Sequence, residues 1–290
     1  MASGIFVGLS TIDVVYGVDE FPAANTKVVA RSQEVFVGGP ATNAAVTFAH
    51  LGGEPALVTA VGRNSLAVVV REELKKHKIQ LVDLNPEFEG LPALSSITVD
   101  RIGNRNVVSA NAIRLTTQPA KVDANLCDSA RVVMVDGHFT DACQAWAGTA
   151  KAHGKPVVLD GGSWKDGTEE LLKSVHTAIC STDFLPPGCA SRDDVIAFLK
   201  NQGVTNIAVT DGAEAIHFVS GQSSGTISVP QVEVVDTMGA GDVFHGAYCF
   251  FASTGRGFIE SLAEAAKIAS ESCRYAGTRE WMKHLRAEHF

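Results

Sequence analysis

A stretch near the C-terminal end, VVDTMGAGDVFHGAY (residues 234–248), combines acids, a threonine and glycines before an apolar run. Residues 232–235 predict a strand and residues 242–254 a helix, with Gly239, Ala240 and Gly241 between them. Free amides and the helix dipole form an anion site at a helix start, and residues this small let a ligand approach the backbone. Asp242 falls in the first helical turn, where the dipole favours the ionised form that can accept a proton from a hydroxyl.

A base beside an anion site indicates phosphoryl transfer. The attacking oxygen then lies between the carboxylate and phosphorus, while amides and magnesium absorb the phosphate charge. Because the transition state is loose, a carboxylate with an ordinary pKa suffices. A glycine-rich turn in which Asp242 only caps the helix would explain the same residues equally well. Other phosphate loops do not match, since GxxxxGK[ST] is absent and the glycines give GxGxxxxG rather than GxGxxG.

Composition indicates a globular protein. The 290 residues suffice for one large α/β domain or two modest ones, and 46% are hydrophobic while 19% are charged. The net charge of −8 argues against wholesale nucleic-acid binding. Six cysteines lie mostly in apolar runs without a CxxC pair, which favours free thiols over disulfides or a zinc site. They are Cys127, Cys143, Cys180, Cys189, Cys249 and Cys273.

Nothing in the sequence indicates export or a membrane partner. Met1 to Gly8 has no basic region before an apolar run and no cleavage pattern. No uninterrupted apolar stretch is long enough to span a bilayer. We therefore expect a cytoplasmic protein.

Most of the chain alternates short apolar strands with amphipathic helices. A helix is expected from Thr42 to Leu51, and strand–helix units follow between residues 131 and 212. Repeated βα units predict a mostly parallel sheet flanked by helices, and ligands bind at the carboxyl edge of such sheets. Acids at four strand ends indicate one shared edge, although each could equally cap a helix or turn. These acids are Asp136, Asp160, Asp183 and Asp211.

Further strand-like segments fall outside this alternation. The opening GIFVGLSTIDVVYGV reads as two strands with Asp13 near the break, and residues 27–37 alternate like a half-exposed strand. Residues 94–115 read as two strands around Gly103-Asn104. The segments at about 12–37 and 94–115 could pair into a small sheet that projects from the main body.

These motifs together resemble the PfkB family, the ribokinase-like sugar kinases. The family's C-terminal signature DTxGAGD is intact from Asp236 to Asp242, and its Gly-Gly pair leading a helix with an Asn matches GGPATNAA. The resemblance runs from VGLSTIDVVYGVDEFP to AAKIASESCRYAG. It implies a ribokinase-like three-layer α/β sandwich with a mostly parallel central sheet and a small β-sheet lid, as a single kinase domain over residues 1–290.

The resemblance also implies roles for the residues of both motifs. Asp242 would be the catalytic base, and the amides of Gly239, Ala240 and Gly241 would bind the transferred phosphoryl group. The substrate hydroxyls would be contacted by Asp13, Gly38, Gly39 and Asn43. A strand-end acid can accept bonds from vicinal hydroxyls, and a glycine pair provides a hinge on which a lid can close.

For cofactors, the resemblance implies ATP with Mg²⁺, and K⁺ in some members. The ATP contacts would be Thr210, Gly212, Thr237, Gly239 and Gly241. A plain βα turn also explains the residues from 210 to 212. Asp236 resembles an acid that helps to hold a monovalent cation in some members, and a structural acid in a turn is the alternative. Asp183 is expected to contact magnesium through water.

Several family patterns are altered. The NxxE motif that organises magnesium-bound water has no Asn in AICSTDFLPPG. VGxDxxG appears as VGRNSLA, the DxNxR-like stretch appears as DGGSWK, and Ala215 replaces the last glycine of TxGxxG. These changes concern the magnesium network and the nucleotide contacts, and they leave the base and the anion site intact.

Some polar residues could select the substrate. Lys27, in the lid, could meet an anionic group of a sugar acid or of a sulfonated or phosphorylated sugar, although lid lysines are usually solvated. Asn111 offers a similar contact, and His138 could face the site or lie at the surface. His245 is expected to pack rather than to catalyse, and the tail REWMKHLRAEHF reads as a solvated helix end.

The expected function is ATP-dependent phosphorylation of a hydroxyl on a sugar or sugar acid. Two alternatives stay open: a nucleoside kinase of the same family, and a catalytically weak sugar- or nucleotide-binding protein on this scaffold. The altered magnesium motif favours the second alternative, and the intact Asp242 argues against it. Because a lid sheet leaves an apolar face that a second subunit often covers in this family, we expect a homodimer joined through the lids.

Overall fold

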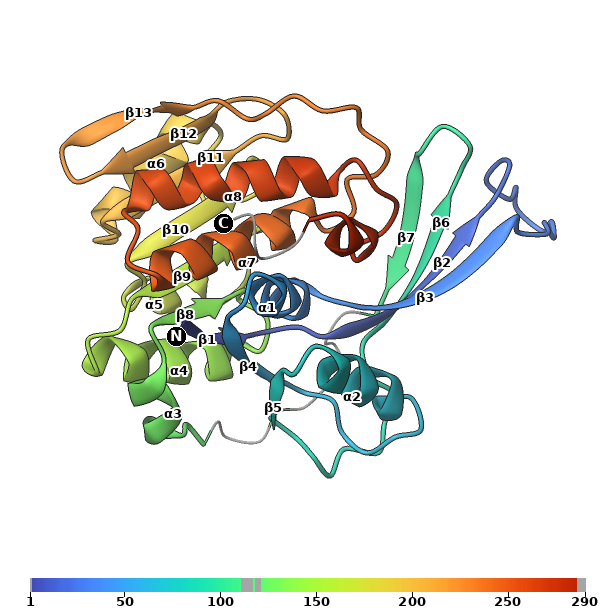
Figure 1. Cartoon of the computed structure of the whole chain (residues 1–290), viewed down its shortest axis with the longest axis horizontal. Helices are drawn as coiled ribbons and strands as arrows, with labels where there is room; N and C mark the ends of the chain where they lie inside the picture. The colour runs from blue at the N-terminus through green and yellow to red at the C-terminus, as the bar shows by residue number, and fades with distance from the viewer. Residues whose placement is uncertain (1, 111–116, 118–120, 286–290) are drawn as a thin grey trace.

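The computed structural model describes residues 2–110, 117 and 121–285. Its main body is a nine-stranded sheet in the order β13-β12-β11-β10-β9-β8-β1-β4-β5 (Figure 1). Neighbours from β5 to β11 are parallel, and the hairpin β12–β13 adds an antiparallel edge. The strands are β1 Ser3–Val7, β4 Glu54–Thr59, β5 Gln80–Asp83, β8 Val132–Val135, β9 Val157–Gly161, β10 Thr177–Ser181, β11 Asn206–Thr210, β12 Ile216–Ser220 and β13 Ser223–Ile227.

Helices cover both faces of this sheet, as buried apolar strands require. On one face lie α1 Pro40–His50, α7 Ala240–Ser253 and α8 Phe258–Ser272, with the 3-10 helix η1 Glu280–Lys283 beside α8. On the other face lie α3 Ala124–Ser129, α4 Thr140–Ala152, α5 Thr168–Leu172 and α6 Arg192–Asn201. The expected three-layer α/β sandwich is therefore confirmed. Within the described ranges, no helix combines the length and apolarity needed to cross a membrane.

A second, four-stranded sheet stands apart from the main body and is the expected small sheet, called the lid below (Figure 1). It has the order β3-β2-β6-β7, and α2 Ala67–Lys76 packs against β5 and against β2 and β3. Its strands are β2 Thr11–Gly17, β3 Ser32–Gly38, β6 Leu94–Val99 and β7 Arg105–Ser109.

The register of the lid separates a polar row from an apolar one. Asp13 lies opposite Ser95, which in turn lies opposite Ser109, so these three side chains share one face. The other face carries Val35 and Val108, which are 53% and 76% exposed. The lid therefore has one face suited to hydroxyl groups and one that leaves apolar surface in solvent.

Two segments expected as strands are loops. Residues 232–235 follow β13 as an irregular segment in which Val234 and Val235 are more than half exposed. The amide of Val235 donates to the carbonyl oxygen of Cys273 at 2.8 Å, at the end of α8, rather than to a strand. Residues 27–31 also lie in a loop. In both places the apolar alternation has no neighbouring strand with which to pair, so β-propensity alone misled the prediction.

α1 and α7 cross at close range, and this crossing positions the site. A Cβ added to Gly246 of α7 would lie 2.3 Å from the carbonyl oxygen of Ala44 in α1, so the contact requires a glycine. α1 begins at Pro40, two residues before the expected start, because proline is favoured in the first helical turn. The crossing brings Asn43 of α1 beside Asp242 of α7.

Candidate active site

The mouth of α7 has the geometry of an anion site. Gly239 precedes the helix with φ 70° and ψ 11°, and a Cβ there would lie 2.8 Å from Cγ2 of Thr278. The amide of Ala240 donates to the carbonyl oxygen of Thr237 at 3.2 Å, which closes the turn. The sequence analysis expected this amide to bind the anion, but the amide is already hydrogen-bonded within the turn. Among the described residues, the amides of Gly239, Gly241 and Asp242 remain available at the helix mouth, and a Cβ at Gly241 would meet nothing within 4 Å.

Asp242 lies beside this turn and is held from α1. Nδ2 of Asn43 donates to Oδ2 of Asp242 at 2.7 Å, and Asn43 is 4% exposed. A Cβ on Gly239 would lie 3.5 Å from Nδ2 of Asn43 and 3.6 Å from Oδ2 of Asp242. The structure thus brings the expected base, an expected substrate contact and the glycine turn together, although Asn43 bonds the base here.

Burial raises the pKa of Asp242 to about 7, and the neighbouring Asp160 carboxylate adds to this rise. The hydrogen bond from Asn43 and the nearby His245 oppose it. The sequence suggested an ordinary pKa with the ionised form favoured by the helix dipole, and that expectation was wrong. The dipole is worth about 0.3–1 kcal/mol at exposed sites, whereas removing a carboxylate from water costs more.

On the lid side, Asp13 is fixed against the hinge glycines. Oδ1 of Asp13 accepts from Oγ1 of Thr11 at 2.9 Å, and a Cβ on Gly38 would overlap Oδ2 at 2.1 Å. Burial raises the pKa of Asp13, opposed by hydrogen bonding to Thr11 and Ser95 and by the charge of Arg279.

The second hinge glycine starts α1. Gly39 has φ 95°, and a Cβ there would lie 2.3 Å from the carbonyl oxygen of Leu9. The chain therefore turns sharply from the lid strand β3 into α1, which carries Asn43.

Asp136, one of the acids at the carboxyl edge, has a structural role. Its carboxylate accepts from the amides of Leu9 at 2.8 Å, Ala41 at 3.3 Å and His138 at 2.8 Å. It is 2% exposed, and burial raises its pKa. These bonds tie the turn before β2, the start of α1 and the end of β8 to one another, so the acid holds the segments that carry Asp13 and Asn43.

A pocket of about 390 Å³ opens on the other side of the α7 mouth. It lies between the carboxyl ends of β10 and β11, the segment 229–237, α7 and α8. Of the expected ATP contacts, Thr210, Gly212, Thr237 and Gly241 line it and Gly239 does not, and Asp183 and Ala240 line it as well. Its apolar side is formed by Ile216, Val229, Val232, Val234, Phe244 and Ala266.

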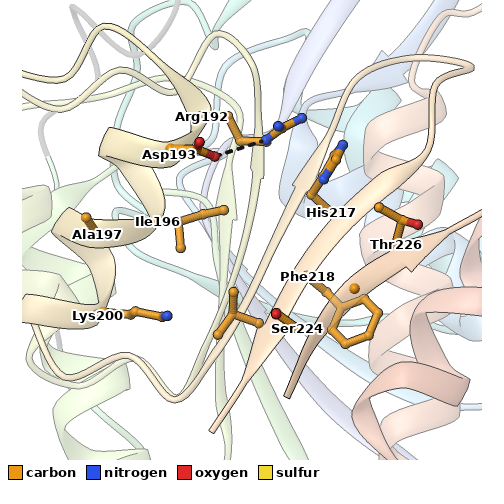
Figure 2. A pocket seen from close by; sticks show the side chains of 11 residues that line it. Arg192, Asp193, Ile196, Ala197, Lys200, His217, Phe218, Ser224 and Thr226 are labelled. Atoms are coloured by element: carbon orange, nitrogen blue, oxygen red, sulfur yellow. Dashed lines mark ion pairs between the residues drawn. The ribbon is translucent and has the colours of Figure 1, made fainter. Parts of the chain in front are cut away.

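A second hollow, of about 500 Å³, lies between α6 and the hairpin β12–β13 (Figure 2). It carries the basic side chains of Arg192, Lys200 and His217, and Arg192 pairs with Asp193 at 3.6 Å. Its lining includes no glycine-led helix mouth beside a buried carboxylate. The α7 mouth lines the pocket of about 390 Å³, so its chemistry favours that pocket over this hollow as the candidate nucleotide site.

The expected substrate-selecting residues are spread more widely. His138 is half-buried at the end of β8, where burial lowers its pKa and the Lys165 charge acts in the same direction. Lys27 is exposed in the connection between β2 and β3. Asn111 lies outside the described residues.

Both carboxylate oxygens of Asp236 accept hydrogen bonds from the backbone. Its Oδ1 accepts from the amide of Met238 at 2.9 Å, and its Oδ2 accepts from the amide of Gly277 at 2.8 Å. Arg105 of the lid strand β7 lies 4.0 Å from Oδ1 and donates to Oγ1 of Thr237 at 2.8 Å. The carboxylate joins the glycine turn to the C-terminal segment, which is the structural role that the sequence left open for it.

The sequence missed a buried arginine in the tail. Arg279 is 15% exposed, donates to the carbonyl oxygen of Val37 at 2.9 Å and pairs with Glu73 at 3.3 Å. Burial lowers its pKa, while Glu73 and, more weakly, Asp242 and Asp13 favour its charged form. Trp281 is fully buried and Met282 and Leu285 pack against the core, so the expected solvated tail was wrong there, whereas Lys283 and His284 are exposed. Trp281 and Met282, four and five residues beyond Gly277, were the sequence signal of this burial.

The chain is similar to proteins of known family and structure. A model of the pfkB family carbohydrate kinases matches residues 1–284. A ribokinase of Staphylococcus aureus is 23% identical over 256 residues, which are 84% of each chain. A bifunctional ribokinase/ribose-5-phosphate isomerase A of Fructilactobacillus sanfranciscensis is 24% identical over 262 residues, and there the match takes up 84% of this chain and 47% of the relative.

Solved structures share the fold at low identity. A ribokinase of Thermotoga maritima superposes with a TM-score of 0.84 and 21% identity over 98% of both chains. A ribokinase of Arabidopsis thaliana complexed with ribose and ATP gives a TM-score of 0.80 and 20% identity over 97% of both chains. With a family model matched along almost the whole sequence, this chain belongs to the pfkB family of carbohydrate kinases and is a phosphotransferase.

Proposed function

We propose that this protein transfers the γ-phosphoryl group of ATP to a hydroxyl of a sugar or sugar acid bound between the lid and α7. The position of Asp242 carries the proposal. Its carboxylate lies at the α7 mouth, beside the glycine turn, and is bonded to Asn43 of the helix that follows the lid hinge. A base, an anion site and a hydroxyl-binding face thus converge on one edge of the sheet.

In the proposed reaction, the acceptor hydroxyl donates a hydrogen bond to Asp242 and its oxygen attacks the γ-phosphorus. The new oxygen–phosphorus bond forms as the bond to the β,γ-bridging oxygen breaks, and ADP leaves. The hydroxyl proton passes to Asp242 and then to water. The amides of Gly241 and Asp242 stabilise the charge on the transferred group.

The pocket beside α7 supports ATP as the donor. Its apolar side suits a purine ring, and its polar end reaches Thr237 and Gly241 at the anion site. Mg²⁺ bound to the phosphates would neutralise their charge. Asp183 is exposed at the pocket and fits a contact to magnesium through water. Because the described ranges contain no cluster of three potential metal ligands, we assign the ion no direct protein ligand set.

We further propose that the lid and the end of β8 select a polar or acidic sugar. The row of Asp13, Ser95 and Ser109 supplies acceptors and donors for hydroxyl groups. At the end of β8, His138 lies near the positive charge of Lys165. Lys27, exposed on the lid, could reach an anionic substituent when the lid closes.

The test is ATP turnover by the purified protein against a panel of sugars, sugar acids and nucleosides, with the Asp242→Asn variant alongside. We expect turnover with at least one sugar or sugar acid. Turnover with nucleosides alone would replace the proposal by a nucleoside kinase. Binding of ATP or a sugar without turnover of any acceptor would identify a binding protein on this scaffold.

The pH profile gives an independent prediction. Because the pKa of Asp242 is about 7, the base is protonated in acid and cannot accept the hydroxyl proton. We expect kcat/KM to rise with pH and to reach half its plateau near pH 7, which initial rates in a constant-ionic-strength buffer series would measure. A rate independent of pH between about 5.5 and 8 would contradict the assignment of Asp242 as the base.

Replacing Gly38 by Ala tests the lid side. The added Cβ would overlap Oδ2 of Asp13, so this carboxylate must turn away from the position fixed by Thr11. Losing a hydrogen bond to a charged group costs about 1.5–3 kcal/mol, which predicts an increase in the sugar KM of about 10–100-fold. The KM for ATP should be unchanged. Gly148→Ala is the control, because a Cβ at Gly148 meets nothing within 4 Å. An unchanged sugar KM in Gly38→Ala would remove Asp13 from the substrate site.

We also propose a cytoplasmic homodimer joined through the lids. The outer face of the lid exposes Val35 and Val108, and Val29 and Ile102 in its connecting loops are 87% and 83% exposed. Apolar surface of this kind is commonly covered by a partner. Sedimentation or gel filtration at micromolar concentration should show a dimer that Val108→Lys weakens. A monomer would contradict the proposal.

A further inference from the structure

His245 lies one turn beyond Asp242 on α7 and is 6% exposed. Both of its ring nitrogens face carbonyl oxygens: Nδ1 is 2.7 Å from that of Gly241, and Nε2 is 3.1 Å from that of Ile179 on β10. A neutral imidazole has a single N–H and can satisfy only one of these acceptors. An imidazolium would donate to both carbonyl oxygens.

A counter-ion for this charge is in place. Oδ1 of Asp160, on β9, lies 3.6 Å from Nε2 of His245, and the two side chains are 8% and 7% exposed. A buried charge is tolerated when it is paired and hydrogen-bonded. His245 has two carbonyl oxygens and one carboxylate around it, which together meet that requirement.

The pair acts on the α7 mouth in two ways. The carbonyl group of Gly241 belongs to the same peptide as the amide of Asp242, so the bond from Nδ1 fixes the orientation of this peptide. The charges of the pair also act on the Asp242 carboxylate in opposite directions, since Asp160 disfavours its ionisation and His245 favours it.

The other charged groups around Asp242 come from different elements. Asp136, after β8, disfavours its ionisation, and Arg279, from the C-terminal segment, attracts its charged form. Asn43 of α1 donates to it without a charge. His245 is thus the basic side chain on the same helix as Asp242, and its ring lies between the nucleotide pocket and the sheet.

We propose that His245 is a positioning residue: as an imidazolium held between two carbonyl oxygens and paired with Asp160, it favours the ionised form of Asp242 at the anion site. The inference rests on the proposed function, because it concerns the base of that reaction. It assigns to this chain a charge balance in which Asp160 and His245 tune the base in opposite directions.

The first readout is the protonation of the ring itself. Two-bond ¹H–¹⁵N spectra of the full-length protein, with ¹⁵N-labelled histidine, distinguish an imidazolium from either neutral tautomer. The His245 signals are identified by their loss in His245→Gln. We expect both ring nitrogens to carry a proton at pH 7.5, because each of them faces a carbonyl oxygen. A neutral ring at that pH would overturn the proposal.

The second readout is the titration of Asp242, followed by the ¹³C shift of its carboxyl group and assigned with Asp242→Asn. Relative to wild type, the pKa should rise by about half a unit or more in His245→Gln and fall by a similar amount in Asp160→Asn. A variant that only loosens the helix would not reverse sign between the two. Shifts in the same direction, or none, would overturn the proposal.

A matched control is His217→Gln, because His217 lies on β12 in the hollow between α6 and the β12–β13 hairpin (Figure 2). It should leave the Asp242 titration unchanged. If His245→Gln does not fold, two measurements still test the proposal. One is the protonation of the wild-type ring, with its signals identified in His245→Asn, and the other is the titration of Asp242 in Asp160→Asn. Both readouts use the free protein. An inactive protein that shows the expected titrations would therefore contradict the proposed function alone. An active protein that does not show these titrations would contradict the role of His245.

Discussion

Replacing Asp242 by Asn is expected to lower kcat by about 10²–10⁴-fold, the range usual for losing a general base. The amide oxygen of the new side chain can still accept the bond from Asn43, so the α7 mouth keeps its shape. What disappears is the group that takes the proton of the attacking hydroxyl. Steady-state kinetics at saturating sugar and ATP measure the change, and the KM values should stay within a few-fold of wild type.

The same variant should be more stable than wild type in alkaline solution. The pKa of Asp242 is about 7 in the folded protein, above its usual value of 3.8, so the folded state binds more protons than the unfolded chain between these pH values. Stability therefore falls as pH rises through this window, and the asparagine, which carries no charge, avoids that loss.

Thermal unfolding supplies the measurement for this comparison. The Tm of Asp242→Asn should exceed that of wild type at pH 8, and the difference should shrink with falling pH and level off below about pH 3, where the aspartate is protonated in both states. A kcat reduced by less than tenfold, with equal Tm values at pH 8, would show that Asp242 is neither strained by burial nor the base.

The local parts of the site could be predicted from the sequence. The turn from Gly239 to Asp242 is contiguous in sequence, so its small residues and its acid predict an anion site at a helix start without knowledge of the tertiary structure. The acids at the strand ends were placed on one edge because parallel strands share their direction. The glycine pair Gly38-Gly39 was found through the resemblance to the family motif, and it lies where β3 leads into α1.

The parts that depend on distant segments could not be predicted. Asp160 and His245 are 85 positions apart, and only the packing of α7 on β9 and β10 brings them to 3.6 Å. Arg279 was read as a tail residue because nothing nearby in sequence reveals that Val37 and Glu73 enclose it. The pKa of Asp242 was misjudged for the same reason: the dipole is visible in the sequence, and the desolvation is not.

The crossing of α1 and α7 shows how strongly the base depends on packing. Replacing Gly246 by Ala would place a Cβ 2.3 Å from the carbonyl oxygen of Ala44 and 2.8 Å from Cβ of Thr47. The backbone of α1 cannot turn aside as a side chain can, so the helices must separate. We expect the free energy of unfolding to fall by about 1–3 kcal/mol, and urea unfolding with an unchanged m-value would measure this.

Gly148→Ala in α4 is the matched control for that loss. It makes the same chemical change inside a helix, but a Cβ there meets nothing within 4 Å, so it should stabilise the protein by about 0.5–1 kcal/mol. Ala44 follows Asn43, and Gly246 lies four residues beyond Asp242, so separating the helices also lengthens the 2.7 Å bond between these two side chains. Gly246→Ala should therefore lower kcat by about tenfold in the protein that remains folded, because a misplaced base transfers protons poorly. Equal stability of the two alanine variants would mean that the close crossing neither requires a glycine nor positions Asp242.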